Sequence, residues 1–192
     1  MNQLKMKWCV TPFEIPEIPE GYRLHKYIRN NDSIFGLQEF KDKWYDLTVK
    51  GISVGEDYKE KYLNDPKIPD DGFFVVLDKY NNLVSTAGIQ IGRHTPDSAT
   101  LHMVVTDPAH RGHHLGKIVT VAVMQYAKDH GIGYVYLTTD DFRKAAVNMY
   151  LKLGFIPCLY DTDMKDRWCA LFDELGFTDR TVLDENENII TI

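Results

Sequence analysis

The sequence predicts a mixed α/β fold in which a mostly antiparallel central sheet is flanked by helices. Residues 73–77 and 83–91 flank a polar turn at 79–82, which is typical of an antiparallel hairpin. Residues 115–126 then place apolar side chains at positions 115, 118, 119, 122, 123 and 126, the spacing of an amphipathic helix. A strand, a helix and a further strand are indicated after it, so both element types contribute to one core.

The segment before the hairpin predicts fewer elements. Residues 11–21 carry three prolines and indicate an irregular lead-in, and residues 22–28 alternate as a first strand would. Residues 34–49 follow helix N-cap candidates and show helical periodicity. A glycine-bearing loop is expected at 50–57 and a short helix at 58–63.

The second half of the chain is patterned more strongly. A third strand is expected at 99–106, where Asp107 and Pro108 end it. The remaining predicted elements are a strand at 134–138, a helix at 145–153 that Gly154 ends, a strand at 155–160 and a helix at 164–175.

Composition predicts one globular domain, residues 1–192. Of the 192 residues, 44% are hydrophobic and 26% charged, enough for a core without disulfides or metals. The net charge of −6 argues against nucleic-acid binding and favours the steering of a cationic acceptor. Three scattered cysteines, the lack of a secretory signal and the lack of a long apolar run predict a cytoplasmic protein without a membrane segment.

The loop between Thr106 and the amphipathic helix is suited to a pyrophosphate. Backbone N–H groups at a helix N-terminus are unsatisfied and lie at the positive end of the helix dipole. Gly112 and Gly116 permit close approach of a ligand, and Arg111 and Lys117 supply positive charge.

Two nucleotide-binding motifs fit this sequence poorly. The Walker loop needs a serine or threonine after its lysine, but Ile118 follows Lys117, and Arg111 stands where its first glycine belongs. Gly131 and Gly133 lack the third glycine of a dinucleotide fingerprint and precede a strand instead of a helix.

Two blocks resemble the GNAT acetyltransferases. Residues 104–112, continuing through 115–117, are similar to the acyl-CoA signature of that family, with Arg111 and Gly116 at its ends and His114 in place of its first glycine. Residues 146–155 resemble a later family motif, a helix with a tyrosine and a closing Gly-Phe. The resemblance covers about 73–160.

The resemblance implies a GNAT-like fold and an N-acetyltransferase that moves an acetyl group from acetyl-CoA to a primary amine in a ternary complex. It implies that the backbone near Val105 polarises the thioester carbonyl and that Tyr150 protonates the departing thiolate. The residues that it assigns to the cofactor are Val104, Val105, Thr106, Arg111, Gly112, His113, His114, Leu115, Gly116, Lys117 and Arg143.

The general base is less defined. His102 shares a strand face with Val104 by simple alternation, and a neutral imidazole there could accept the amine proton; solvent is the alternative. No acidic or cysteine ligand accompanies His110, His113 and His114, so no metal site is expected.

Residues 1–72 and 161–192 are expected to shape the acceptor pocket, with Trp44, Tyr45, Tyr160 and Trp168 as candidate walls. The acceptor can be an amine on a small molecule, a peptide or a protein, and the chain a monomer or a homodimer. Asp140 and Asp141 are expected to cap the following helix. A catalytically silent CoA-binding sensor or regulatory module is the alternative function.

Overall fold

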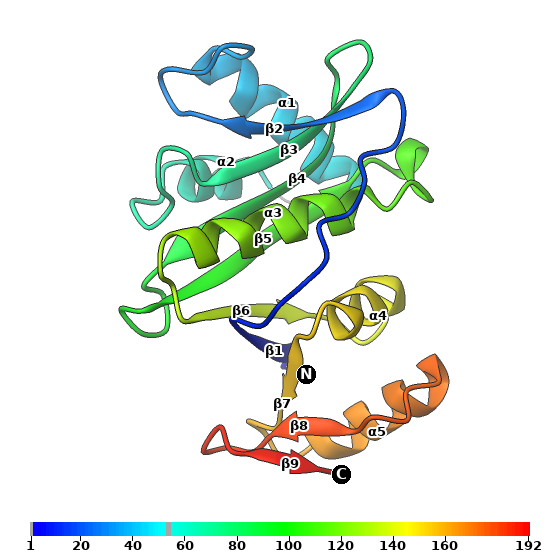
Figure 1. Ribbon diagram of the computed structural model, residues 1–192. Helices are drawn as coiled ribbons and strands as arrows, with labels where there is room; N and C mark the ends of the chain where they lie inside the picture. The colour runs from blue at the N-terminus through cyan, green and yellow to red at the C-terminus, as the bar shows by residue number, and fades with distance from the viewer. Residues whose placement is uncertain (1, 53–54) are drawn as a thin grey trace. The chain divides into compact units, whose positions relative to one another are not determined.

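The computed structural model describes residues 2–52 and 55–192, which form two compact units (Figure 1). One unit is Glu14–Gly133; the other combines the N-terminal residues through Phe13 with Tyr134–Ile192. Both contain antiparallel strands and helices, so the predicted mixed, mostly antiparallel α/β class is confirmed.

The first unit contains four antiparallel strands in the order β2-β3-β4-β5. The strands are β2 (Tyr22–Tyr27), β3 (Phe73–Asp78), β4 (Leu83–Ile91) and β5 (Ser98–Thr106). The predicted hairpin is β3–β4, and its turn is fixed by Asp78, whose carboxylate accepts hydrogen bonds from the N–H groups of Tyr80 and Asn82. Asn81 in this turn has φ of 66°, a left-handed conformation that asparagine tolerates.

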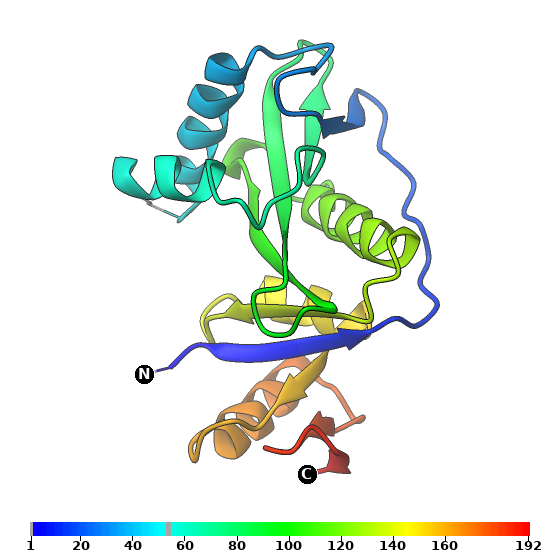
Figure 2. The ribbon, with the colours of Figure 1, turned by 90° about the vertical axis from the view of Figure 1, so that its left-hand side faces the viewer.

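Helices cover both faces of this sheet (Figure 2). Helices α1 (Leu37–Ile52) and α2 (Glu56–Leu63) lie on one side and α3 (Leu115–Asp129) on the other. The core under α1 and α2 is aromatic, with Tyr27 stacked on Phe40 at 3.6 Å between ring centroids. Stacked and edge-to-face rings of this kind add stabilisation beyond the apolar area they bury.

Helix α1 begins and ends later than the sequence pattern predicts. The carboxylate of Asp32 accepts hydrogen bonds from the N–H groups of Ile34 and Phe35, which holds these residues in a turn, and the helix starts at Leu37. Because α1 continues to Ile52 and α2 starts at Glu56, the expected loop at 50–57 is shorter, and residues 53–54 of it lie outside the described residues.

The second unit contains five strands in the order β6-β1-β7-β8-β9. They are β6 (Tyr134–Thr139), β1 (Leu4–Cys9), β7 (Ile156–Cys158), β8 (Thr181–Leu183) and β9 (Ile189–Thr191). All neighbouring pairs are antiparallel except β7 and β8. Helices α4 (Lys144–Lys152) and α5 (Met164–Leu175) pack against each other.

Strand β1 was not predicted, although it lies between β6 and β7. Its apolar face, Leu4, Met6 and Trp8, is fully buried. On the opposite face Lys7 is also buried, because its ammonium forms an ion pair of 2.5 Å with Glu187 and lies 3.8 Å from the ring centroid of Tyr134. A lysine-rich stretch can therefore occupy an interior strand.

Two of the candidate pocket walls are core residues instead. Trp44 and Trp168 are at most 1% exposed, so neither lines an open pocket. Tyr160 is partly exposed and donates its hydroxyl to the carbonyl of Gln3, and Tyr45 lies under the ammonium of Lys59.

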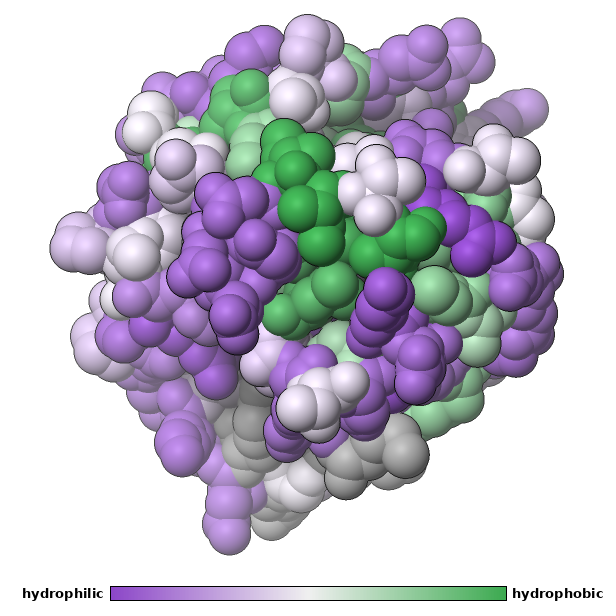
Figure 3. All heavy atoms as spheres, turned by 90° about the horizontal axis from the view of Figure 1, so that it is seen from below, coloured by the Kyte–Doolittle hydropathy of each residue, from purple (hydrophilic) through white to green (hydrophobic). Residues whose placement is uncertain are grey.

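The last strand leaves apolar side chains on the surface. Ile189 of β9 is 70% exposed, and Ile190 is exposed as well. The view from below shows hydrophobic side chains gathered among hydrophilic ones (Figure 3).

Within the described part of the chain, no helix has the length and apolar character that crossing a bilayer requires.

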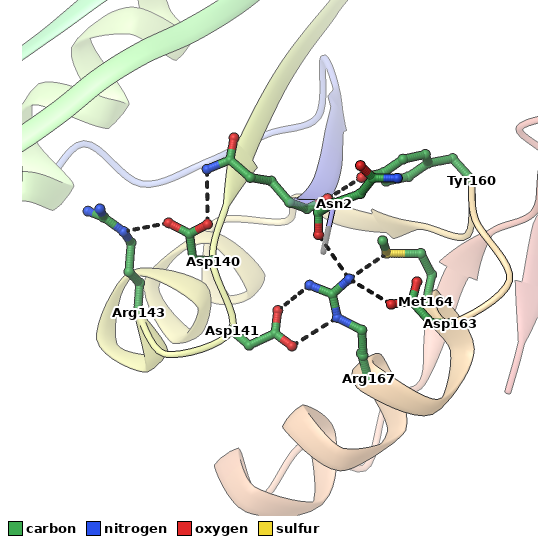
Figure 4. Close-up of polar contacts among 9 residues, drawn as sticks. Asn2, Asp140, Asp141, Arg143, Tyr160, Asp163, Met164 and Arg167 are labelled. Carbon is green, nitrogen blue, oxygen red and sulfur yellow. Dashed lines mark hydrogen bonds and ion pairs between the residues drawn. The ribbon is translucent and has the colours of Figure 1, made fainter.

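Arg167 lies at the centre of one group of polar contacts in the second unit (Figure 4). Arg167 of α5 donates Nε and Nη2 to the two carboxylate oxygens of Asp141, at 2.9 and 2.5 Å. Its Nη1 donates to Asp163 at 3.2 Å and to the carbonyl of Asn2 at 2.9 Å. The side chain is only 12% exposed, so these are strong, partly desolvated hydrogen bonds.

We expect Arg167→Met to lower the free energy of unfolding by about 1.5 kcal/mol, because charge-assisted hydrogen bonds to two partly exposed carboxylates are lost. Urea unfolding followed by circular dichroism measures this change. The control is Lys165→Met, an exposed residue of the same helix. Equal stability of the two variants would mean that the arginine contributes no more than a surface ion pair.

Candidate active site

Strand β5 contains a bulge that sets the direction of its side chains. Its pairing with β4 passes from Gly88–His102 to Thr86–Val105, so β5 has one more residue than its partner between these pairs. Val105 packs toward α1, and His102 contacts Tyr62 of α2. His102 therefore shares a face with Val105, and the prediction that it shares one with Val104 is wrong because strict alternation does not allow for the bulge.

His102 is held beside α2. The Tyr62 hydroxyl donates to the carbonyl of His102, and the two ring centroids lie 4.9 Å apart. Burial, and to a lesser extent the charge of Arg93, lower the pKa of His102 to about 4. The imidazole is neutral at neutral pH and can accept a hydrogen bond, but it is a weak base.

The segment after β5 turns twice before the next helix. The 3₁₀ helix η1 (Pro108–His110) is capped by Asp107, whose carboxylate accepts the N–H of Ala109 at 2.9 Å. Gly112 then has φ of 86°, and His114, the N-cap of α3, has φ of 56°. Gly112 is needed for this conformation and not for space, because no atom of the described residues, its chain neighbours aside, lies within 4 Å of where its Cβ would be.

These turns leave a row of backbone donors without partners. Among the described residues, no protein group accepts a hydrogen bond from the N–H groups of residues 112–116. The first backbone bond of α3 is the one from Lys117 to the carbonyl of His114, at 2.9 Å. Successive free amides at a helix N-terminus form an anion-binding site.

The side chains of the loop differ in exposure. Arg111 and His113 are exposed, Lys117 is half-buried and Leu115 is buried as the first residue of α3. The ring of His113 lies 5.2 Å from that of Tyr22.

Tyr22 also supports the loop from β2, and sequence reasoning missed this residue. Its hydroxyl lies 3.0 Å from Nδ1 of His110. A contact between residues 88 positions apart has no local signal in the sequence.

Within the described residues, no group of three histidine, cysteine, aspartate or glutamate side chains is arranged to hold a metal ion.

Tyr150 and Arg143 belong to the second unit. Tyr150 of α4 is buried edge-on against Phe155, and this burial raises the pKa of its hydroxyl well above the usual value, so the phenol stays protonated. Arg143, the N-cap of α4, forms a 3.0 Å ion pair with Asp140 (Figure 4). The prediction that Asp140 and Asp141 cap α4 is wrong: no side chain of the described residues caps this helix, and both carboxylates bind arginines.

Comparison with known proteins identifies the class. The family model of the acetyltransferase (GNAT) family matches residues 28–155, and the chain belongs to this family. The match includes β5, the loop with the free amides, α3 and Tyr150.

The sequence identity to two individual relatives is 28% or less. The chain is 28% identical over 149 residues to a mycothiol acetyltransferase of Thermobispora bispora, covering 76% of this chain and 50% of that protein. It is 27% identical over 144 residues to a mycothiol acetyltransferase of Actinosynnema mirum, covering 74% and 47%. The chain thus spans about half the length of the curated relatives that it matches.

Solved structures show the same fold. A GCN5-related N-acetyltransferase of Sphaerobacter thermophilus matches with a TM-score of 0.61 at 18% identity, over 80% of this chain and 47% of that one. The ribosomal-protein-S18-alanine N-acetyltransferase of Escherichia coli matches with a TM-score of 0.55 at 15% identity, over 69% and 76%.

The lowered pKa of His102 predicts a pH dependence of stability. Since the folded value, about 4, lies below the ordinary 6.5, the unfolded chain binds this proton more readily between these values. The free energy of unfolding should therefore fall by up to about 3 kcal/mol as the pH falls from 6.5 to 4.

Urea unfolding at several pH values tests this prediction by comparing wild type with His102→Gln. The variant should show a flatter dependence, since it lacks the group that the unfolded chain protonates more readily than the folded chain in this window. The control is His94→Gln, an exposed histidine outside β5. The same slope in wild type and His102→Gln would contradict the assignment.

Proposed function

We propose that the chain is an N-acetyltransferase that uses acetyl-CoA as donor and a primary amine as acceptor, by direct attack in a ternary complex. The observation that carries this proposal is the row of free amides at residues 112–116, in the segment that matches the family. These donors, with Arg111 and Lys117, suit the pyrophosphate of coenzyme A.

The reaction needs a polarised carbonyl, a nucleophilic amine and a proton for the leaving group. The amine nitrogen attacks the thioester carbon, the carbon–sulfur bond breaks, and the thiolate takes a proton. We assign carbonyl polarisation to the backbone near Val105, because the extra residue of the bulge lies between His102 and Val105, and the extra residue of a bulge is left unpaired in the ladder. Tyr150 suits the acid because its hydroxyl stays protonated until a stronger base approaches.

The proton of the amine leaves to water or through His102. A pKa of about 4 makes His102 unable to hold this proton at neutral pH, so it acts as a hydrogen-bond acceptor that passes the proton to solvent. The described cysteines, Cys9, Cys158 and Cys169, are all free thiols, which suits the reducing cytoplasm that we propose as the compartment.

Calorimetric titration with acetyl-CoA tests the donor, with desulfo-CoA as comparison. Saturable binding to one site per chain, followed by thiol release with an amine panel, would support the proposal. Binding without thiol release would support the silent sensor instead. Absence of binding would remove both.

We expect Gly116→Asp to weaken acetyl-CoA binding at least about tenfold, since it adds bulk and negative charge beside the amides that hold the phosphates. Calorimetry measures the change. The control is Gly36→Asp, which makes the same substitution at an exposed glycine with open space around it. Unchanged affinity in Gly116→Asp would contradict the loop assignment.

We expect Tyr150→Phe to lower kcat about 10²-fold while the affinity for acetyl-CoA stays the same, because only proton donation to the thiolate is lost. Steady-state thiol release and calorimetry give the two quantities. The control is Tyr134→Phe in β6. An unchanged kcat would exclude Tyr150 from the mechanism.

A further inference from the structure

A polar cavity of about 310 Å³ lies within the first unit, beside the C-terminal end of α2. Its floor is made by Tyr62 of α2, Gln90 of β4 and His102 of β5, of which Tyr62 and Gln90 are buried. Its rim carries the exposed cations Lys61, Lys67 and Arg93 and the half-buried Asp65; these rim residues come from α2 and from the loops that follow α2 and β4.

Among the described lining residues, the single carboxylate is already engaged. Asp65 accepts a hydrogen bond from the Gln90 side chain at 2.7 Å and another from the backbone N–H of Lys67 at 2.8 Å. The other end of the Gln90 amide accepts from Nη1 of Arg93 at 3.1 Å. Gln90 thus links the arginine to the carboxylate and holds both at the rim.

The three cations of the rim keep their charge available. Among the described side chains, no ion pair joins Lys61, Lys67 or Arg93 to a carboxylate. His102 below them is neutral at neutral pH, because burial and Arg93 hold its pKa near 4. Three cations against one carboxylate leave an excess of two positive charges, opposite in sign to the net charge of −6 of the whole chain.

We infer that this cavity binds an anionic group, a carboxylate or a phosphate, of a small acetyl acceptor. The inference rests on the proposed acetyltransferase function, since the cavity ends at His102, the candidate acceptor of the amine proton. Arg93 presents a planar fork of N–H donors that matches carboxylate and phosphate oxygens, and the lysines add positive charge. A cavity of this size suits a small molecule.

Matched pairs of acceptors test the inference through selectivity. The carboxylate pair is β-alanine and propylamine, and the phosphate pair is phosphoethanolamine and ethanolamine. We expect kcat/KM to be at least about tenfold higher for the anionic member of at least one pair, and the preferred pair identifies the group. Equal or higher values for both amines that lack the anionic group would overturn the inference.

Arg93→Gln should remove the preference, lowering kcat/KM for the anionic acceptor about tenfold while the neutral amine changes less than about twofold. Arg93→Lys should retain part of it, because charge remains and the fork is lost. The control is Lys79→Gln, which removes an exposed charge in the β3–β4 turn, outside the cavity. A preference that survives in Arg93→Gln would overturn the assignment.

A binding measurement separates this inference from the proposed function. β-Alanine and phosphoethanolamine are titrated into the protein without acetyl-CoA, and nuclear magnetic resonance follows the ring signals of His102. Saturable shifts that are lost in Arg93→Gln but kept in Lys79→Gln would support the anion site even if no amine is acetylated. Absence of saturable shifts with both ligands in wild type would overturn the anion site, even if neutral amines are acetylated.

Discussion

Backbone hydrogen bonding at the start of α3 imposes the constraint on which the candidate site depends. A helix cannot satisfy its first N–H groups internally, and here the two left-handed residues before it, Gly112 and His114, turn the preceding chain so that no protein acceptor reaches them within the described residues. Residues 112–114 are exposed, so water can accept from these donors, and an anion at the same place would replace that water. Arg111 and Lys117 then add charge to a site that the backbone defines. The pyrophosphate assignment therefore depends more on conformation than on any side chain. His114, at a glycine position, has a φ of 56°, a left-handed conformation that histidine adopts more often than most other residues with a side chain.

The bulge in β5 has a comparable effect on the acceptor side. One extra residue between the Gly88 and Thr86 pairings changes which side chains face α1 and α2, and His102 is placed over a cavity instead of beside Val104. Burial of His102 lowers its pKa, and the positive charge of Arg93 lowers that pKa further. The imidazole is therefore neutral, while Arg93 keeps its charge. A single insertion in the strand thus determines both the position and the protonation state of this histidine.

The sequence predicted the periodic elements well because their signals are local. The stripe of α3, the β3–β4 hairpin and the bounds of α5 depend on spacing within one segment. What it could not predict depends on distant partners. Lys7 in β1 is buried only because Glu187, 180 residues away, neutralises it, and Tyr22 reaches His110 across 88 residues. The bulge leaves no mark in the composition of residues 99–106. Strict alternation along the strand therefore predicts the wrong face for His102. Leu4, Met6 and Trp8 do alternate with lysines, and that pattern was the available signal for β1.

The cationic rim and the weak base act on the amine proton in the same direction. An ammonium group held near Lys61, Lys67 and Arg93 is disfavoured by like charge, which lowers its pKa and favours the neutral, nucleophilic form. An anionic group on the same acceptor offsets part of this repulsion during binding, so the acceptor is attracted through one end and loses its proton more easily at the other. Deprotonation then needs no strong base, and the pKa of about 4 at His102 is compatible with a role as a hydrogen-bond acceptor on the path to solvent. In this proposal the same charges that bind an anionic acceptor also favour the loss of its amine proton.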